Sequence, residues 1–260
     1  MKRNNLKLYF LLGLNLLLII SCADKKQIAY YQNINQVAAQ DKENNFESKI
    51  QPDDLLMIVV SAPDPEAAAP FNLETISVPT AIGQTTQGQR QQQLYLVDAN
   101  GLIQFPVLGE INVIGQTKTQ IVTLLKNKLI YAIKDPIINM RIINFKVTVQ
   151  GEVAKPGSFT IASERITLPE ALSLAGDLTI YGKRNSVLLI REKNGVKTYE
   201  KIDITKTDFI NSANYYLSQN DVIYVEPNKT KLNSSAVGPN LTIGISALSL
   251  VVTILALTLK

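Results

Sequence analysis

Apolar residues are distributed in three different ways along the chain. Residues 8–20 are almost wholly apolar and follow three basic residues, and residues 241–259 form a second apolar run without any charge. Between them, short apolar runs alternate with polar turn residues, which is typical of strands and amphipathic helices. The pattern therefore predicts two terminal segments directed at membranes and a folded region between them.

The short apolar runs of the central region predict strands, because they are bounded by Gly, Pro, Asn and Asp. The predicted strands are residues 55–60, 95–97, 102–106, 138–149, 186–191, 196–202 and 221–225. The turn from Asp98 to Gly101 places Asn-Gly between two of these runs, which is a strong hairpin signal. We therefore expect residues 95–97 to pair with residues 102–106.

Two helices are predicted in the same region, each opened by a capping box. Thr117 and Gln120 have the spacing of such a box, and so have Thr167 and Glu170. The apolar residues of the first helix fall on one face: Ile121, Leu124, Leu125 and Leu129. The second helix is expected to run from residue 168 to 175. Strands and helices together predict an α+β fold.

The N-terminal segment resembles a bacterial lipoprotein signal. Lys2, Arg3 and Lys7 precede an apolar run of about 13 residues, too short for a comfortable membrane-spanning helix. Cys22 is the only cysteine of the chain and directly follows Ser21, so we expect residues 1–21 to be removed and Cys22 to be acylated. The alternative is a signal-anchor helix with an incidental cysteine. Asp directly after the acylated cysteine is the usual signal for retention in the inner membrane. Here Ala23 occupies that position, which favours the outer membrane.

The C-terminal segment is predicted to be a transmembrane helix. Residues 241–259 would form about 28 Å of helix, close to the thickness of a bilayer core. Small hydroxylated side chains recur along it at steps of four, three and four, at Thr242, Ser246, Ser249 and Thr253. This stripe is either a packing seam between helices or a pore-lining face in a ring of identical helices.

Composition excludes several functional classes. The chain has no His and one Cys, so Ser-His-Asp catalysis, His-ligated metals and an intrachain disulfide are excluded. The formal charge of +4 falls to about +1 once residues 1–21 are removed, which gives no electrostatic reason to expect nucleic-acid binding.

A hydrolase that uses two carboxylates is a further alternative. Its candidates would be Asp53, Asp54 and Asp98. All three lie in predicted turns, where Asp is common for conformational reasons. We therefore expect no enzymatic activity, no catalytic residue, no cofactor and no metal site.

Several motifs resemble those of the outer-membrane polysaccharide export lipoprotein family. Three stretches resemble the export domain of that family: residues 52–60 (PDDLLMIVV), 97–106 (VDANGLIQFP) and 109–117 (GEINVIGQT). The later part resembles the soluble-ligand-binding β-grasp (SLBB) module of the same family, on residues 149–157 (VQGEVAKPG), 167–176 (TLPEALSLAG) and 221–225 (DVIYV).

The resemblance implies a domain order. After the signal peptide, residues 22–48 would be a tether. The remaining regions would be an export domain at 49–145 with a mobile Gln-rich insertion near 80–93, a β-grasp-like module at 146–228, a linker at 229–240 and the transmembrane helix at 241–259.

The resemblance also implies a function. Members form ring-shaped homo-oligomers, usually octamers, that carry capsular polysaccharide or exopolysaccharide from the periplasm to the cell surface. Their folded body lies in the periplasm below the outer membrane and meets an inner-membrane co-polymerase that regulates chain length, in some systems coupled to a tyrosine kinase. The alternative is a periplasm-facing glycan-binding lipoprotein without transport activity, which would not need the C-terminal helix.

Overall fold

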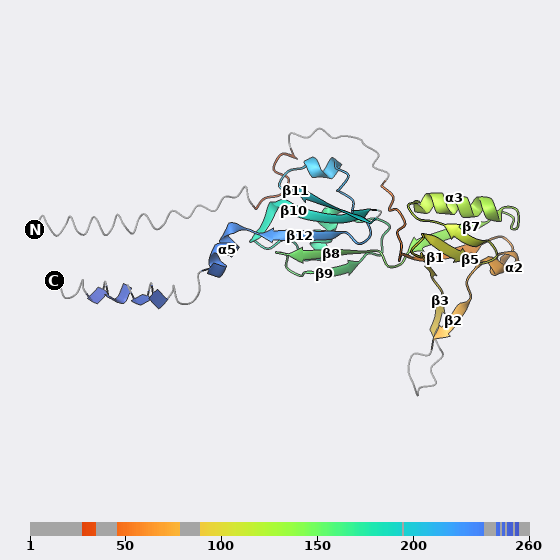
Figure 1. The fold of residues 1–260 in the computed structure, drawn as a ribbon, viewed down its shortest axis with the longest axis horizontal. Helices are drawn as coiled ribbons and strands as arrows, with labels where there is room; N and C mark the ends of the chain where they lie inside the picture. Colours follow the sequence, from red (N-terminus) through yellow and green to blue (C-terminus); the bar gives the residue numbers. More distant parts are fainter. Residues whose placement is uncertain are drawn as a thin grey trace, which may run out of the picture.

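The computed structural model describes residues 28–34, 46–78, 89–193 and 195–236, and short stretches of the C-terminal segment within residues 243–254. Two hydrophobic cores lie on either side of Asn144 along the chain, and Figure 1 shows the two corresponding bodies next to each other. The first core belongs to residues 50–140 and the second to residues 145–225. Cys22 lies outside the described residues.

The first body contains a three-stranded antiparallel sheet in the order β4-β1-β7. These strands are β1 (Leu55–Ser61), β4 (Tyr95–Leu96) and β7 (Ile137–Ile142). Buried residues alternate along β1 with partly exposed ones, because successive side chains of a strand point to opposite faces. Ile58 of β1 lies opposite Met140 of β7, and both are buried in the first core.

Helix α3 (Lys118–Leu129) contacts this sheet along β7. Its predicted capping box is confirmed, since the Thr117 hydroxyl accepts a hydrogen bond from the backbone N–H of Gln120 and the Gln120 side-chain oxygen accepts one from the backbone N–H of Thr117. The face buried in the core comprises Ile121, Leu125 and Leu129, while Leu124 is partly buried at its edge.

The predicted hairpin between residues 95–97 and 102–106 is wrong in its pairing. The turn itself forms, because the Asp98 carboxylate accepts hydrogen bonds from the backbone of Asn100 and Leu102 at 2.9 and 2.8 Å. The strands on its two sides then diverge: β4 pairs with β1, and β5 (Leu102–Phe105) pairs with β6 (Gly109–Asn112). The β5–β6 pair buries Ile103, Phe105 and Ile111 in the first core.

A second hairpin projects from the first body, as Figure 1 shows. It follows helix α2 (Pro65–Ala68) and the short 3₁₀ helix η3 (Ala69–Phe71), and pairs β2 (Thr75–Val78) with β3 (Gln89–Gln92). The predicted insertion near 80–93 therefore ends in a strand at residues 89–92. Its remaining residues up to 88 lie outside the described part of the chain.

The second body is built on a mixed five-stranded sheet in the order β11-β10-β12-β8-β9. Strands β12 and β8 are parallel, and the other neighbours are antiparallel. The strands are β8 (Lys146–Gly151), β9 (Gly157–Thr160), β10 (Gly182–Lys193), β11 (Val196–Ile202) and β12 (Val222–Pro227).

Helix α4 (Leu168–Leu174) supplies the helical part of the second core. The capping box of Thr167 and Glu170 is confirmed, with Pro169 in the first turn, where proline is tolerated. Leu168, Ala171 and Leu172 are buried against strand residues of the sheet. A short 3₁₀ helix, η4 (Asp208–Asn211), adds Phe209 to the same core.

The single strand predicted at residues 138–149 is in fact two strands in two different sheets. Strand β7 ends at Ile142 and β8 begins at Lys146. Ile142 packs against both cores, while Phe145 is already buried in the second. The strand-like pattern continues through residues 138–149 and therefore hid the junction between the two bodies, because both of its halves are strands.

The predicted C-terminal transmembrane helix is not supported. No helix within the described residues is long and apolar enough to cross a membrane. The longest of them, α3, has twelve residues and spans about 18 Å, short of the ~30 Å hydrocarbon core. Helix α5 (Lys229–Ala236) occupies part of the predicted linker and is polar.

The four residues predicted to line a pore are placed only in part. Thr242 lies outside the described residues. In the described helical fragments, the hydroxyl of Ser249 donates to the carbonyl of Ser246 at 2.8 Å, and that of Thr253 donates to the carbonyl of Ser249 at 2.7 Å. The pore-lining interpretation depends on a membrane-spanning helix, which the described residues do not contain.

Candidate functional site

Asn144 joins the two bodies and is held by hydrogen bonds from both. Its side-chain oxygen accepts from the backbone of Leu55 at 2.8 Å, and its amide donates to the carbonyl of Asp53 at 2.8 Å. On the other side, Gln219 donates to the carbonyl of Asn144 at 3.0 Å and accepts from the backbone of Lys146 at 2.8 Å. Three of these hydrogen bonds fix Asn144 itself, and the fourth ties Gln219 to the start of the second body.

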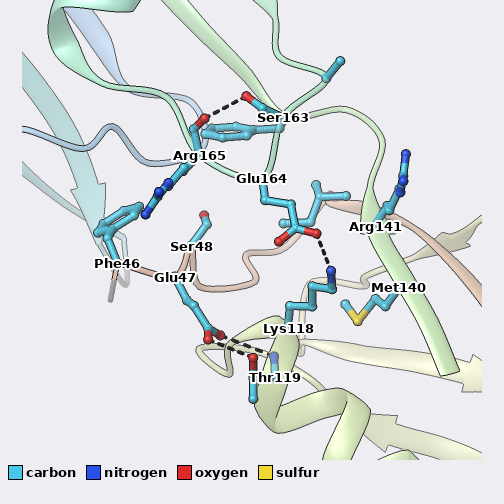
Figure 2. A pocket seen from close by; sticks show the side chains of 13 residues that line it. Phe46, Glu47, Ser48, Lys118, Thr119, Met140, Arg141, Ser163, Glu164 and Arg165 are labelled. Atoms are coloured by element: carbon cyan, nitrogen blue, oxygen red, sulfur yellow. Dashed lines mark hydrogen bonds and ion pairs between the residues drawn. The ribbon is translucent and has the colours of Figure 1, made fainter. Parts of the chain in front are cut away.

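A cleft of about 660 Å³ opens beside this junction (Figure 2). Four stretches that are distant in the sequence form its walls: residues 46–48, the first turn of α3, the end of β7 and the loop 162–165. The first body supplies α3 and β7, and the second supplies the loop. We treat this junction cleft as the candidate functional site.

Ionic and hydrogen-bonding side chains face one side of the junction cleft. Lys118 at the start of α3 forms an ion pair with Glu164 of the second body, which bridges the cleft. Glu47 accepts from the hydroxyl of Thr119 at 2.8 Å. Hydrogen bonds from Thr117 and Thr119 lower the pKa of the Glu47 carboxyl, so it remains charged at the positive N-terminus of the helix.

Aromatic and cationic groups lie on the other side. The Phe46 and Tyr216 rings stack at 5.1 Å with an interplanar angle of 13°. The guanidinium of Arg165 lies over the Tyr216 ring at 5.3 Å from its centroid. This arrangement uses the cation–π attraction and leaves the guanidinium N–H groups available for a ligand.

Ser48 is the residue of the junction cleft with the least satisfied polar group. It is 8% exposed, and its hydroxyl has no hydrogen-bond partner among the described residues. Figure 2 shows the side chain pointing into the space between Arg165 and Glu164. A buried hydroxyl without a partner is costly, so it marks a place where an incoming hydroxyl or carboxylate would be stabilised.

The three aspartates considered for carboxylate catalysis do not lie in the junction cleft. Asp98 stabilises its own turn, and Asp53 lies in a turn with a positive φ of 67°. Asp54 is fully buried; one of its oxygens accepts from the backbone of Gln51 at 2.9 Å, and the other has no partner among the described residues. Nor do the described residues contain a group of three or more Cys, Asp or Glu side chains able to hold a metal ion.

Burial raises the pKa of the Asp54 carboxyl to about 6, because desolvation penalises the charged form more than the Gln51 hydrogen bond favours it. A raised pKa stabilises the fold below the unfolded pKa, and that stabilisation is lost as pH rises through about 6. We therefore expect Asp54→Asn to raise the free energy of unfolding at pH 8 by about 1–3 kcal/mol.

The measurement for Asp54→Asn is chemical denaturation of both proteins at pH 8 and pH 5. The advantage of the variant should shrink at pH 5, where wild-type Asp54 is largely protonated. Glu66→Gln, on the exposed start of α2, is the control and should show no such pH dependence. If the difference in the free energy of unfolding between variant and wild type is the same at pH 8 and pH 5, the prediction is wrong.

Part of the predicted tether is bound to the second body. The Tyr30 hydroxyl donates to Asp177 at 2.7 Å, and the backbone of Gln32 donates to the carbonyl of Thr205 at 2.7 Å. The side-chain oxygen of Asn33 accepts from the backbone of Thr207, also at 2.7 Å. Residues 28–34 therefore follow a defined path, which the polar composition of the segment did not reveal.

Comparison with known proteins identifies both bodies. Residues 42–143 match the family of polysaccharide biosynthesis/export proteins, and residues 145–225 match the SLBB domain. The boundary between the two matches falls at Asn144, where the structure places the junction. The predicted presence of an export domain followed by one SLBB module is confirmed.

Two curated relatives share the name EPS I polysaccharide export outer membrane protein EpsA. The protein of Ralstonia solanacearum is 29% identical over 136 residues, which cover 51% of this chain and 36% of the relative. That of Ralstonia nicotianae is 32% identical over 136 residues, covering 51% of this chain and 35% of the relative. The matched residues thus cover about a third of the length of these relatives. The chain thus contains a polysaccharide biosynthesis/export domain followed by an SLBB domain.

Proposed function

We propose that the protein is an outer-membrane subunit of a translocon that exports capsular polysaccharide or exopolysaccharide from the periplasm to the cell surface. The observation that carries the proposal is the uninterrupted succession of export domain and SLBB domain over residues 42–225. The subunits would assemble as a ring, with an octamer as the copy number that the family resemblance suggests. Enzymatic activity forms no part of this function.

Lipid attachment at Cys22 belongs to the same proposal. Ile28, where the described N-terminal segment begins, lies six residues after Cys22, a distance that an extended chain covers in about 20 Å. Because residues 28–34 are bound to the second body, an acyl chain on Cys22 would hold that body close to the outer membrane. Figure 1 places α5 at the same end of the second body, away from the first body.

The export domain would then lie at the periplasmic end of the subunit. There it would meet an inner-membrane polysaccharide co-polymerase that regulates chain length, in some systems with tyrosine kinase activity. The β2–β3 hairpin projects from this domain and extends the surface open to a partner or a neighbouring subunit.

Deletion of the gene in the native host tests the function. Surface polysaccharide, measured with a polymer-specific antibody on intact cells, should be lost and polymer should be retained in the periplasm. Wild-type protein should restore surface polymer, whereas Cys22→Ser should not restore it. Normal surface polymer in the deletion strain would contradict the proposal and favour a glycan-binding lipoprotein without transport activity.

A further inference from the structure

We propose that the junction cleft binds an acidic sugar unit, a hexuronate or similarly carboxylated residue, of the polymer. The inference rests on the proposed function, which makes the ligand a polysaccharide. The structure supplies the position of the binding site and the charge of the sugar that it would bind. It assigns a binding site to the boundary between the two domains, where both contribute to the walls.

The dimensions of the junction cleft suit a short stretch of polysaccharide. Its volume of about 660 Å³ is within the ~300–1,000 Å³ of typical small-molecule sites. Apolar side chains of Met140, Ile142 and Phe145 contribute to the lining and could contact the apolar face of a sugar ring. Charged and hydroxyl groups line the rest, so a ligand with hydroxyls at its edge matches the surface.

The ionic groups that line the junction cleft are three cations, Lys118, Arg141 and Arg165, and two carboxylates, Glu47 and Glu164, so the cleft has a net positive charge. Glu164 is paired with Lys118, and Glu47 accepts hydrogen bonds from Thr119 at the start of α3. Arg165 forms no ion pair with any residue in the described ranges, and its contact is with the Tyr216 ring. A ligand carboxylate would complete this set, because guanidinium binds carboxylate with two parallel hydrogen bonds.

Ser48 supplies the second, independent observation. Its hydroxyl is buried, lacks a partner among the described residues and points into the cleft (Figure 2). A sugar hydroxyl or carboxylate oxygen would satisfy it. A neutral sugar could satisfy Ser48 but not Arg165, so the pair selects for an acidic unit.

The binding test uses full-length detergent-extracted protein and two probes, a hyaluronan tetrasaccharide containing glucuronate and neutral cellotetraose. Isothermal titration calorimetry should show that the acidic probe binds with at least tenfold higher affinity than the neutral one. Raising NaCl from about 0.02 to about 0.3 M should weaken that binding, because the contact is ionic.

Three variants locate the contact. Arg165→Gln should weaken binding of the acidic probe at least tenfold, and Ser48→Ala should weaken it severalfold. Lys197→Gln, on the exposed strand β11 far along the sheet from β8, is the matched control and should bind as wild type. Thermal unfolding of each variant checks that the fold is retained, and two variants at separate positions guard against a misfolded protein.

Two results would overturn the inference: equal affinity for both probes, or unchanged binding by Arg165→Gln. A changed assembly mass in Arg165→Gln without loss of probe binding would also overturn it, since a neighbouring copy would then fill the cleft. The deletion strain separates this inference from the proposed function. If wild-type and Arg165→Gln proteins restore surface polymer equally, the proposed export function is supported and the inferred binding site is not needed for it.

Discussion

Replacing Asp221 with alanine is expected to lower the free energy of unfolding by about 3–5 kcal/mol, which is enough to unfold many domains. Asp221 is fully buried and accepts hydrogen bonds from Arg191 at 2.9 and 2.6 Å, so the two form a buried ion pair. The alanine variant would leave the Arg191 guanidinium buried with only the carbonyl of Tyr216 as a partner. Urea denaturation of the wild type and the variant measures the difference.

Two comparisons make this prediction specific. The double variant Arg191→Met with Asp221→Leu should recover much of the lost stability, because apolar side chains can replace a buried ion pair. Glu226→Gln, which removes a partly exposed pair with Lys183, should cost less than about 1 kcal/mol. A loss below 1 kcal/mol in Asp221→Ala would contradict the buried pair.

Alanine at Gly151 is expected to disrupt the SLBB sheet. Gly151 has a φ of +90°, and a Cβ atom there would lie 2.1 Å from the carbonyl oxygen of Val225 on the neighbouring strand. Left-handed strain and the clash with backbone together should cost about 3–5 kcal/mol, because a strand cannot give way as a flexible side chain does. Circular dichroism melting should show a large fall in Tm or no cooperative transition.

Gly109 provides the matched control for Gly151, since each is followed by Glu at the end of a strand. Gly109 is the first residue of β6 and Gly151 is the last residue of β8. The φ of Gly109, +74°, is similar, but nothing lies within 4 Å of a Cβ built there. Gly109→Ala should therefore cost only the conformational strain, about 1 kcal/mol. Equal destabilisation by the two substitutions would mean that the clash with Val225 is relieved by a small movement of the strands.

Local features of this fold could be predicted from the sequence. The capping boxes at Thr117 and Thr167 depend on residues three positions apart, and both formed as expected. The strands predicted at residues 186–191 and 196–202 also formed, and they pair with each other as parts of β10 and β11, which are adjacent in the chain.

Pairing between distant segments could not be predicted in the same way. Strand β4, which precedes the Asp98 turn, pairs with β1, and the run at 138–149 divides between two sheets at Asn144. In each case the strand is evident in the sequence, but its partner is selected by burial in a core that forms from many segments.

The junction cleft was not foreseen at all. Its polar groups include those of Glu47, Ser48, Lys118, Glu164 and Arg165, which share no motif and no regular spacing. An unpartnered hydroxyl such as that of Ser48 is recognisable only once its neighbours are known. The C-terminal helix is the opposite case, a feature that was predicted but not found. Hydropathy alone predicted a membrane-spanning helix that the described residues do not contain.

The position of β12 in the SLBB sheet has a consequence for the order in which the domain can fold. The last strand of the domain lies between β10 and β8, and Val222 is parallel-paired with Thr148 near the start of the domain. Contacts between residues so distant in the chain form slowly and require the whole domain to be present. Until β12 is in place, β8 and β10 each present an unpaired edge, so the incompletely synthesised module is exposed to wrong strand pairing and aggregation.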